Sequence, residues 1–134
     1  MKMKFVLLSL SVALAACSVF QKESPQSPSI EGTWQEYTMK DSSFSCVDKN
    51  MIQISKADDI YKIESGGTIP YAFSHIHLTD NNFTFQRSHT SESNQTSVVA
   101  YNLFVNSDYT LMNGTSYSDQ GVTLEIEYRV ILEN

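Results

Sequence analysis

The chain has 134 residues, a length that suits one folded domain. Its 9 basic and 15 acidic residues give a formal charge of −6. A nucleic-acid-binding protein needs a basic patch, so this balance argues against that class. An acidic surface stays well solvated, and it also suits a cationic partner.

The first 16 residues have the layout of a secretory signal peptide. Lys2 and Lys4 provide a positive start, and the segment Phe5–Leu14 is apolar except for Ser9 and Ser11. A charged start, an apolar centre and small residues at the cleavage site are typical of such peptides. A membrane-spanning helix needs about 20 apolar residues, and polar residues begin too early for that.

The segment Leu14-Ala15-Ala16-Cys17 resembles the lipobox of bacterial lipoproteins. The resemblance implies cleavage before Cys17, a diacylglyceryl group on its sulfur and, in many bacteria, an acylated amine, commonly a palmitate. Two or three acyl chains make a lasting anchor, since one chain alone binds weakly. Ser18 stands where aspartate favours inner-membrane retention, so we expect an outer-membrane lipoprotein facing the periplasm. The alternative is an ordinary secreted protein with a chance cysteine.

Residues 17–30 form a polar tether in this interpretation. Pro25 and Pro28 lie among serines and glutamines, and apolar groups are too few for packing. We therefore divide the chain into a signal peptide (1–16), a lipidated tether (17–30) and a folded domain (31–134). Removal of Lys2 and Lys4 leaves 7 basic against 15 acidic residues, a formal charge of −8.

The chain has two cysteines, Cys17 and Cys46. If Cys17 carries lipid, we expect Cys46 to be a small buried hydrophobe or to pair with another molecule. A catalytic thiol is not indicated, because no histidine lies near Cys46 in the sequence.

Residues 31–134 alternate short runs of Ile, Val, Tyr, Phe and Thr with turn residues, and no stretch keeps a helical period over three turns. This pattern predicts an all-β domain. Short connections imply an antiparallel meander, with longer loops only at Lys40–Asn50 and His89–Gln95. The expected strands are Thr33–Met39, Met51–Ser55, Ile60–Ser65, Pro70–Leu78, Phe83–Ser88, Thr96–Val105, Tyr109–Tyr117 and Val122–Leu132.

Eight meandering strands remove their exposed edges by closing on themselves, so we expect an eight-stranded antiparallel up-and-down barrel. The last strand alternates cleanly, with Ile126, Tyr128 and neighbours of the same parity on one face. If Asn106-Ser107-Asp108 is a three-residue loop, the inward face of the sixth strand lies opposite Tyr109 and Leu111.

Gly32-Thr33-Trp34 resembles the Gly-x-Trp signature of lipocalins and related calycins, and Ser107-Asp108-Tyr109 is similar to their Thr-Asp-Tyr motif. Arg129 is a candidate for the basic residue that this family packs over the tryptophan. The resemblance implies a reduced lipocalin-like barrel without the C-terminal helix. Independently of the family, Gly32 allows a tight entry into the sheet, and Trp34 is the largest available plug for one end. A guanidinium on an indole contributes roughly 0.5–2 kcal/mol.

His75, His77 and His89 are the candidate metal ligands, because histidines at i and i+2 share a strand face. A three-residue loop at Asp80-Asn81-Asn82 would turn them inward beside Arg87. A two-residue loop at Asp80-Asn81 would turn His75 and His77 to solvent and place apolar residues inside. We favour the second register, because it buries more apolar surface and leaves no charge inside.

No catalytic arrangement is indicated. The sequence has no Gly-x-Ser-x-Gly elbow, no phosphate loop and no His-Glu-x-x-His. Glu125 and Glu127 fall on the solvent face of the last strand. We therefore expect neither an enzyme nor a cofactor.

Two functions stay open. The first is a binding module whose barrel takes a small apolar ligand. The second is a protein-interaction or inhibitor module with a filled barrel, similar to membrane-bound lysozyme inhibitors, which are small lipobox-bearing barrels with a cationic target. The loops Lys40–Asn50 and His89–Gln95 would carry that second function, although that family's Ser/Gly-rich loop motif and disulfide are not recognisable here. The ligand-lining residues expected for the first are Tyr101, Leu103, Tyr128, Phe83 and Phe85.

Overall fold

The computed structural model describes residues 29–132. The expected signal peptide, Cys17 and most of the tether lie outside that range. Within it, all regular structure is β-strand. No helix among residues 29–132 is long and apolar enough to cross a membrane.

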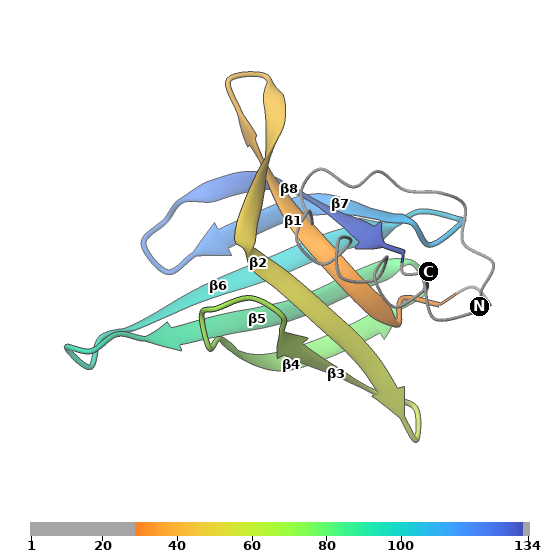
Figure 1. The fold of residues 1–134 in the computed structure, drawn as a ribbon, viewed down its shortest axis with the longest axis horizontal. Helices are drawn as coiled ribbons and strands as arrows, with labels where there is room; N and C mark the ends of the chain where they lie inside the picture. The colour runs from red at the N-terminus through yellow and green to blue at the C-terminus, as the bar shows by residue number, and fades with distance from the viewer. Residues whose placement is uncertain (1–28, 133–134) are drawn as a thin grey trace, which may run out of the picture.

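Eight strands form one sheet in the order β3-β2-β1-β8-β7-β6-β5-β4, and every hydrogen-bonded pair is antiparallel. The first strand pairs with the last, which confirms the nearly closed up-and-down barrel (Figure 1). The strands are β1 Gly32–Lys40, β2 Ser43–Ala57, β3 Ile60–Ser65, β4 Ala72–Thr79, β5 Asn82–Thr90, β6 Thr96–Val105, β7 Leu111–Ser118 and β8 Thr123–Ile131.

The barrel is incomplete between β3 and β4, the two ends of the strand order. Side chains rather than ladder hydrogen bonds bridge this seam. Tyr61 of β3 meets the ring of Phe83 edge-on at 6.4 Å between centroids, and Phe73 and Leu78 of β4 pack on the same core. At this seam, β3 and β4 thus contribute apolar side chains to the same core without pairing with each other.

The expected loop at Lys40–Asn50 is wrong, because β2 begins at Ser43 and runs for 15 residues. Asp41 and Ser42 both have positive φ, as in the tight primed turns whose twist matches two antiparallel strands. The strands can therefore continue on both sides of the turn. The longer β2 contains a bulge. Gln35 pairs with Met51 and Tyr37 pairs with Cys46, so residues 47–50 of β2 lie opposite a single residue of β1.

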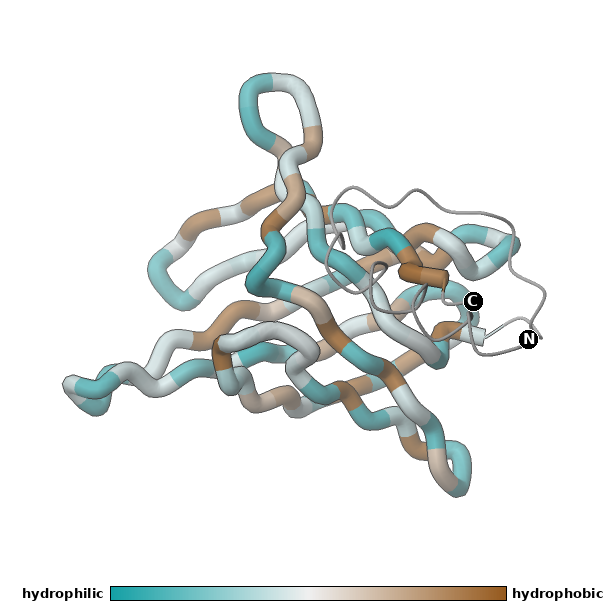
Figure 2. The backbone as a smooth tube through the Cα atoms, in the orientation of Figure 1, coloured by the Kyte–Doolittle hydropathy of each residue, from teal (hydrophilic) through white to brown (hydrophobic). Residues whose placement is uncertain are grey.

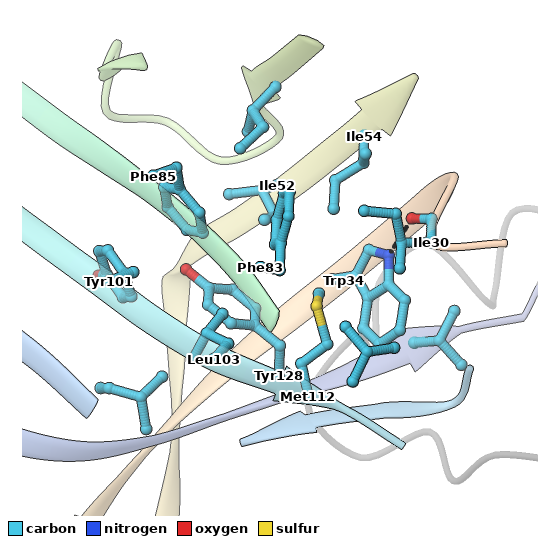
Figure 3. Close-up of a cluster of buried hydrophobic side chains, with 14 residues drawn as sticks. Ile30, Trp34, Ile52, Ile54, Phe83, Phe85, Tyr101, Leu103, Met112 and Tyr128 are labelled. Atoms are coloured by element: carbon cyan, nitrogen blue, oxygen red, sulfur yellow. Dashed lines mark hydrogen bonds between the residues drawn. The ribbon is translucent and has the colours of Figure 1, made fainter. Parts of the chain in front are cut away.

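Alternate residues of most strands meet inside the barrel, and those of β4 pack against them partly buried (Figure 3). Trp34 is fully buried at the end where the chain enters, and its Nε1 donates to the carbonyl of Ile30 at 2.8 Å. Ile30, assigned to the tether by sequence, is itself buried in the core. Gly32 has a φ of 137°, a region that favours glycine, as its position before Trp34 indicated.

The expected pairing of β6 with β7 is wrong. Val105 lies opposite Met112, and Tyr109 lies in the preceding loop with a φ of 61°. The cause is the side chain of Asn106, whose Oδ1 accepts from the backbone N–H groups of Thr110 and Leu111. This extends the loop to 106–110, so the even-numbered positions of β7 face the core.

The expected turn between β4 and β5 is confirmed. Leu78 pairs with Phe83 across Asp80-Asn81, and His77 pairs with Thr84. The pairing shifts between Ser74 and His77, where His75 has a φ of 53°. Figure 2 shows the resulting pattern, with hydrophilic hairpin tips and apolar positions spread along the strands.

Candidate functional site: a charged cluster inside the barrel

Two charged side chains lie inside the barrel among apolar ones. Glu36 follows the buried Trp34 by two residues on β1, and Arg87 follows the buried Phe85 by two residues on β5. Side chains alternate along a strand, so both point inward. The spacing of two residues from a large apolar side chain can be read from the sequence. It is the signal that could have predicted that both charged residues point inward.

Glu36 is the centre of the cluster and is only 3% exposed. Its Oε1 accepts hydrogen bonds from the hydroxyls of Tyr101, at 3.0 Å, and Tyr128, at 2.7 Å. Nη1 of Arg87 lies 3.7 Å from the same oxygen. Buried charges are stable only when paired and hydrogen-bonded, and Glu36 meets both conditions.

Arg87 is satisfied less completely than Glu36. Its side chain is 14% exposed, and its guanidinium lies 4.2 Å from the ring centroid of Tyr71 and 5.5 Å from that of Tyr101. Nη1 is fully buried and has no hydrogen-bond acceptor in the structure. This donor therefore has an ion-pair partner, Oε1 of Glu36, but makes no hydrogen bond at this point of the interior.

The cluster shifts the ionisation of its members. Burial, and then the charge of Glu36, raise the pKa values of Tyr101 and Tyr128 well above their usual range. Burial lowers the pKa of Arg87, but Tyr101, Glu36 and the other tyrosines together raise it above its usual value. At neutral pH the phenols therefore stay protonated as donors, and Arg87 stays charged.

Tyr71 covers the guanidinium from the 66–71 link between β3 and β4. Its hydroxyl donates to Oδ1 of Asn50 at 3.1 Å. The N–H of Gly66 donates to the carbonyl of Met51 at 2.6 Å, which ties the start of the link to β2. A Cβ on Gly67 would overlap the backbone of Lys49, so this close approach requires glycine.

The bulge of β2 is fixed from the other side by Gln35. Its Nε2 donates to the carbonyl of Val47 at 2.6 Å, while its own side chain is 1% exposed. This bond holds the bulged segment against β1 and brings Asn50 within reach of Tyr71. The bulged segment thus supplies the acceptor, Asn50, for the hydroxyl of the ring that covers Arg87.

The five expected ligand-lining residues do meet inside the barrel, all of them 3% exposed or less. They pack on one another. Phe85 stacks on Tyr101 at 4.6 Å between centroids, and Phe83 lies 5.4 Å from Phe85 (Figure 3). Tyr128 and Leu103 complete the same cluster. These side chains fill the part of the barrel that extends toward Trp34.

The expected motif residues have different positions. Asp108 lies in the turn before β7, where its Oδ1 accepts from the hydroxyl of Thr110 at 2.7 Å. That hydrogen bond lowers the pKa of Asp108. Arg129 does not cover Trp34 as the resemblance implied. It lies on the outer face of β8, with its guanidinium 3.8 Å from the ring centroid of Tyr37.

The histidines do not form a metal site. His75 and His77 are exposed, and the bulge between them removes their common face. His89 is half-buried and meets the ring of Tyr71 at 5.7 Å. Residues 29–132 contain no group of three potential metal ligands. The expectation of a charge-free interior was wrong, because Arg87 shares the inward parity of Phe83 and Phe85.

Cys46 is half-buried on β2 and disulfide-bonded, not the buried thiol that was one of the two expectations. The chain has only two cysteines. Lipid on the sulfur of Cys17 would therefore require the disulfide of Cys46 to involve another molecule.

Comparison of the chain with known proteins identified no related protein. No protein-family model matches the chain, and neither the curated proteins nor the solved structures give a significant match.

Proposed function

We propose that this protein is a binding module, anchored at the outer membrane through lipid on Cys17, whose barrel takes a small ligand beside Arg87. One observation carries the proposal: the buried Nη1 of Arg87 has no hydrogen-bond acceptor, and the carboxylate oxygen that it pairs with is 3.7 Å away. A buried donor without a partner costs about 1–3 kcal/mol, and a bound acceptor removes that cost. The nearly closed eight-stranded barrel is compatible with a lipocalin-like binding fold.

The site lies toward the end of the barrel that we call the mouth, defined by the turn Asp41-Ser42, the link 66–71 and the turns 91–95 and 119–122. Leu124 shares the inward strand face of Ile126 and Tyr128, yet it is 41% exposed. Val122, just before β8, is 50% exposed. Two large apolar side chains are thus available to a ligand beyond the level of Glu36.

The far part of the barrel is filled by aromatic packing, which changes the ligand that we expect. A wholly apolar molecule deep in the barrel would have to displace stacked rings such as Phe85 and Tyr101. A ligand at the mouth needs no such rearrangement. It places an apolar body along Leu124 and a polar group toward Arg87, with Tyr71 as the cover that must move.

Tyr71 is suited to that movement because its link pairs in no strand of the sheet. It is held by one side-chain hydrogen bond to Asn50 and by ring contacts with Arg87, His89 and Phe73, and its backbone N–H bonds only within the link, to Ile69. Loops that cover binding sites open more readily than ladder-bonded strands.

The alternative interaction module is not favoured. The expected loop Lys40–Asn50 belongs largely to β1 and β2, whereas only His89 and Thr90 of the expected loop His89–Gln95 belong to β5.

The test is native mass spectrometry of the lipoprotein purified gently from its own membranes. We expect a small molecule that copurifies with the wild type and is lost in Leu124→Ser. The matched control is Phe104→Ser, which removes a large apolar side chain that is 56% exposed on the outer face of β6. The proposal fails if the wild type carries no ligand, or if both variants lose it equally.

A further inference from the structure

We infer that the ligand group held at Arg87 is an uncharged hydrogen-bond acceptor, such as an amide, ester or ketone oxygen, and not a carboxylate. This inference rests on the proposed function and specifies its ligand class. It follows from the charges that surround the Nη1 atom, which is ion-paired with Glu36 but has no hydrogen-bond acceptor.

The interior charge is already balanced. Glu36 on β1 and Arg87 on β5 are the ion pair of the cluster, with Nη1 and Oε1 3.7 Å apart. Tyr101 on β6 and Tyr128 on β8 contribute neutral hydroxyls, both of which donate to Glu36. His89 is the other titratable side chain on the inward face of β5, and its ring meets Tyr71.

A charged ligand group would disturb this balance. A carboxylate at Nη1 would bring a second negative charge close to Oε1 of Glu36, and two buried like charges repel each other strongly. An ammonium group would meet Arg87, and Oε1 already accepts two phenolic hydrogens. Either ion would also lose its hydration without gaining a net counter-charge.

A neutral acceptor has neither penalty. It completes the hydrogen bonding of Nη1, and the bond is strengthened because its donor is charged. The hydroxyl of Tyr71 is engaged with Asn50 when the cover is closed, so it does not compete for the acceptor. The cluster therefore binds a polar ligand group without requiring that the group be charged.

The experiment compares three probes with the same chain: hexanamide, hexanoate and hexylammonium. The intact lipoprotein in nanodiscs is titrated by calorimetry and by ¹⁵N NMR of its arginine side chains, with empty nanodiscs as the blank. We expect hexanamide to bind about tenfold more tightly than either ion, the factor that one such hydrogen bond provides. The Arg87 signal should shift with hexanamide, and the signal of Arg129, which lies on the outer face of β8, should not.

Glu36→Gln tests the reason for this preference. Glutamine keeps an oxygen for the two tyrosine hydroxyls but removes the negative charge, so Arg87 becomes an uncompensated cation. We expect the order to reverse, with hexanoate binding about tenfold more tightly than hexanamide. A cooperative thermal unfolding transition shows that the variant is folded. If the variant does not fold, the affinities of the three probes for the wild type decide whether the ligand group is neutral.

The outcomes separate the two proposals. Tighter binding of hexanoate or hexylammonium to the wild type at the Arg87 signal overturns the neutral-acceptor inference and leaves the binding module standing. Binding of none of the three probes, together with a ligand-free native protein, overturns the proposed function itself.

Discussion

Nη1 of Arg87 lies 3.7 Å from Oε1 of Glu36, and this ion pair crosses the interior of the barrel. β1 and β5 are not neighbours in the sheet, because β8, β7 and β6 separate them in the strand order. The pair therefore joins opposite walls through side chains alone. Its two members are far apart in the sequence and meet only when the sheet curls.

Removal of one partner should be far more harmful than replacement of both. We expect Glu36→Ala to lower the free energy of unfolding by about 3–5 kcal/mol, because it leaves Arg87 charged and buried. Glu36→Leu combined with Arg87→Met should cost much less. Denaturant unfolding measures both.

The control for this prediction is the surface pair of Lys62 and Glu64, whose side chains are 70% and 60% exposed. Lys62→Ala should change stability by less than about 1 kcal/mol. If Glu36→Ala is as mild as that surface change, the cluster contributes little to the fold.

Alkaline pH should destabilise the protein through its buried tyrosines. The pKa values of Tyr101 and Tyr128 are raised in the folded state, so their contribution is complete below the unfolded value of about 10. Above that pH the unfolded chain loses protons that the folded chain keeps. Stability then falls by up to about 1.4 kcal/mol per pH unit for each tyrosine until the folded pKa is reached.

Unfolding measured from pH 9 to 11 checks this slope. Tyr128→Phe should be less stable at neutral pH, because Glu36 loses a donor, but its slope above pH 10 should be shallower. Tyr117→Phe, at a position 57% exposed, should keep the wild-type slope. Equal slopes in all three proteins would contradict the assignment of the effect to buried phenols.

Gly114 on β7 allows a close approach to β6. A Cβ there would overlap the carbonyl oxygen and carbon of Asn102, which are backbone atoms and cannot turn away. We expect Gly114→Ala to lower the unfolding free energy by about 1–3 kcal/mol, the usual cost of overpacking. Asn113→Ala, at the adjacent exposed position, is the control and should stay within about 0.5 kcal/mol of the wild type.

Cys17→Ser tests the membrane anchor. We expect the variant to leave the membrane fraction and appear in the soluble periplasmic fraction, because the remaining chain has no other lipid attachment in our proposal. Fractionation followed by immunoblotting measures this. The Cys46→Ser variant should stay with the membrane, and a Cys17→Ser protein that stays there too would refute lipid anchoring at this sulfur.

Local patterns were enough to predict the strands. The predicted bounds of β3 and β6 agree with the structure, and all eight strands were predicted. This succeeded because the alternation of apolar residues depends only on the residues of the strand itself. The errors arose at connections. The length of β2 and the pairing of Val105 with Met112 depend on the positive φ of Asp41 and Ser42 and on the side chain of Asn106.

The candidate site was predicted in part. Tyr101, Tyr128 and Phe85 were expected inside, and they are. The alternation of side chains also predicts that Glu36 and Arg87 point inward. That prediction was not made, because charged side chains were expected to lie outside the barrel. Burial of a single unpaired charge would destabilise the fold too much, and the sequence alone does not show that an oppositely charged residue lies on the opposite strand of the barrel.

The sequence by itself determined an all-β domain of eight antiparallel strands and, for most of them, the face that turns inward, because both depend on residues close together in the chain. The inward face of β7 was the exception, since the length of the loop before it sets which residues turn inward. Only the tertiary structure decided which inward residues meet. Asn50, in the bulged part of β2, accepts a hydrogen bond from Tyr71, whose ring lies over Arg87, and the curl of the sheet brings Glu36 to the same point. These contacts join residues that local spacing cannot relate, since loop geometry and sheet closure set the distances between them.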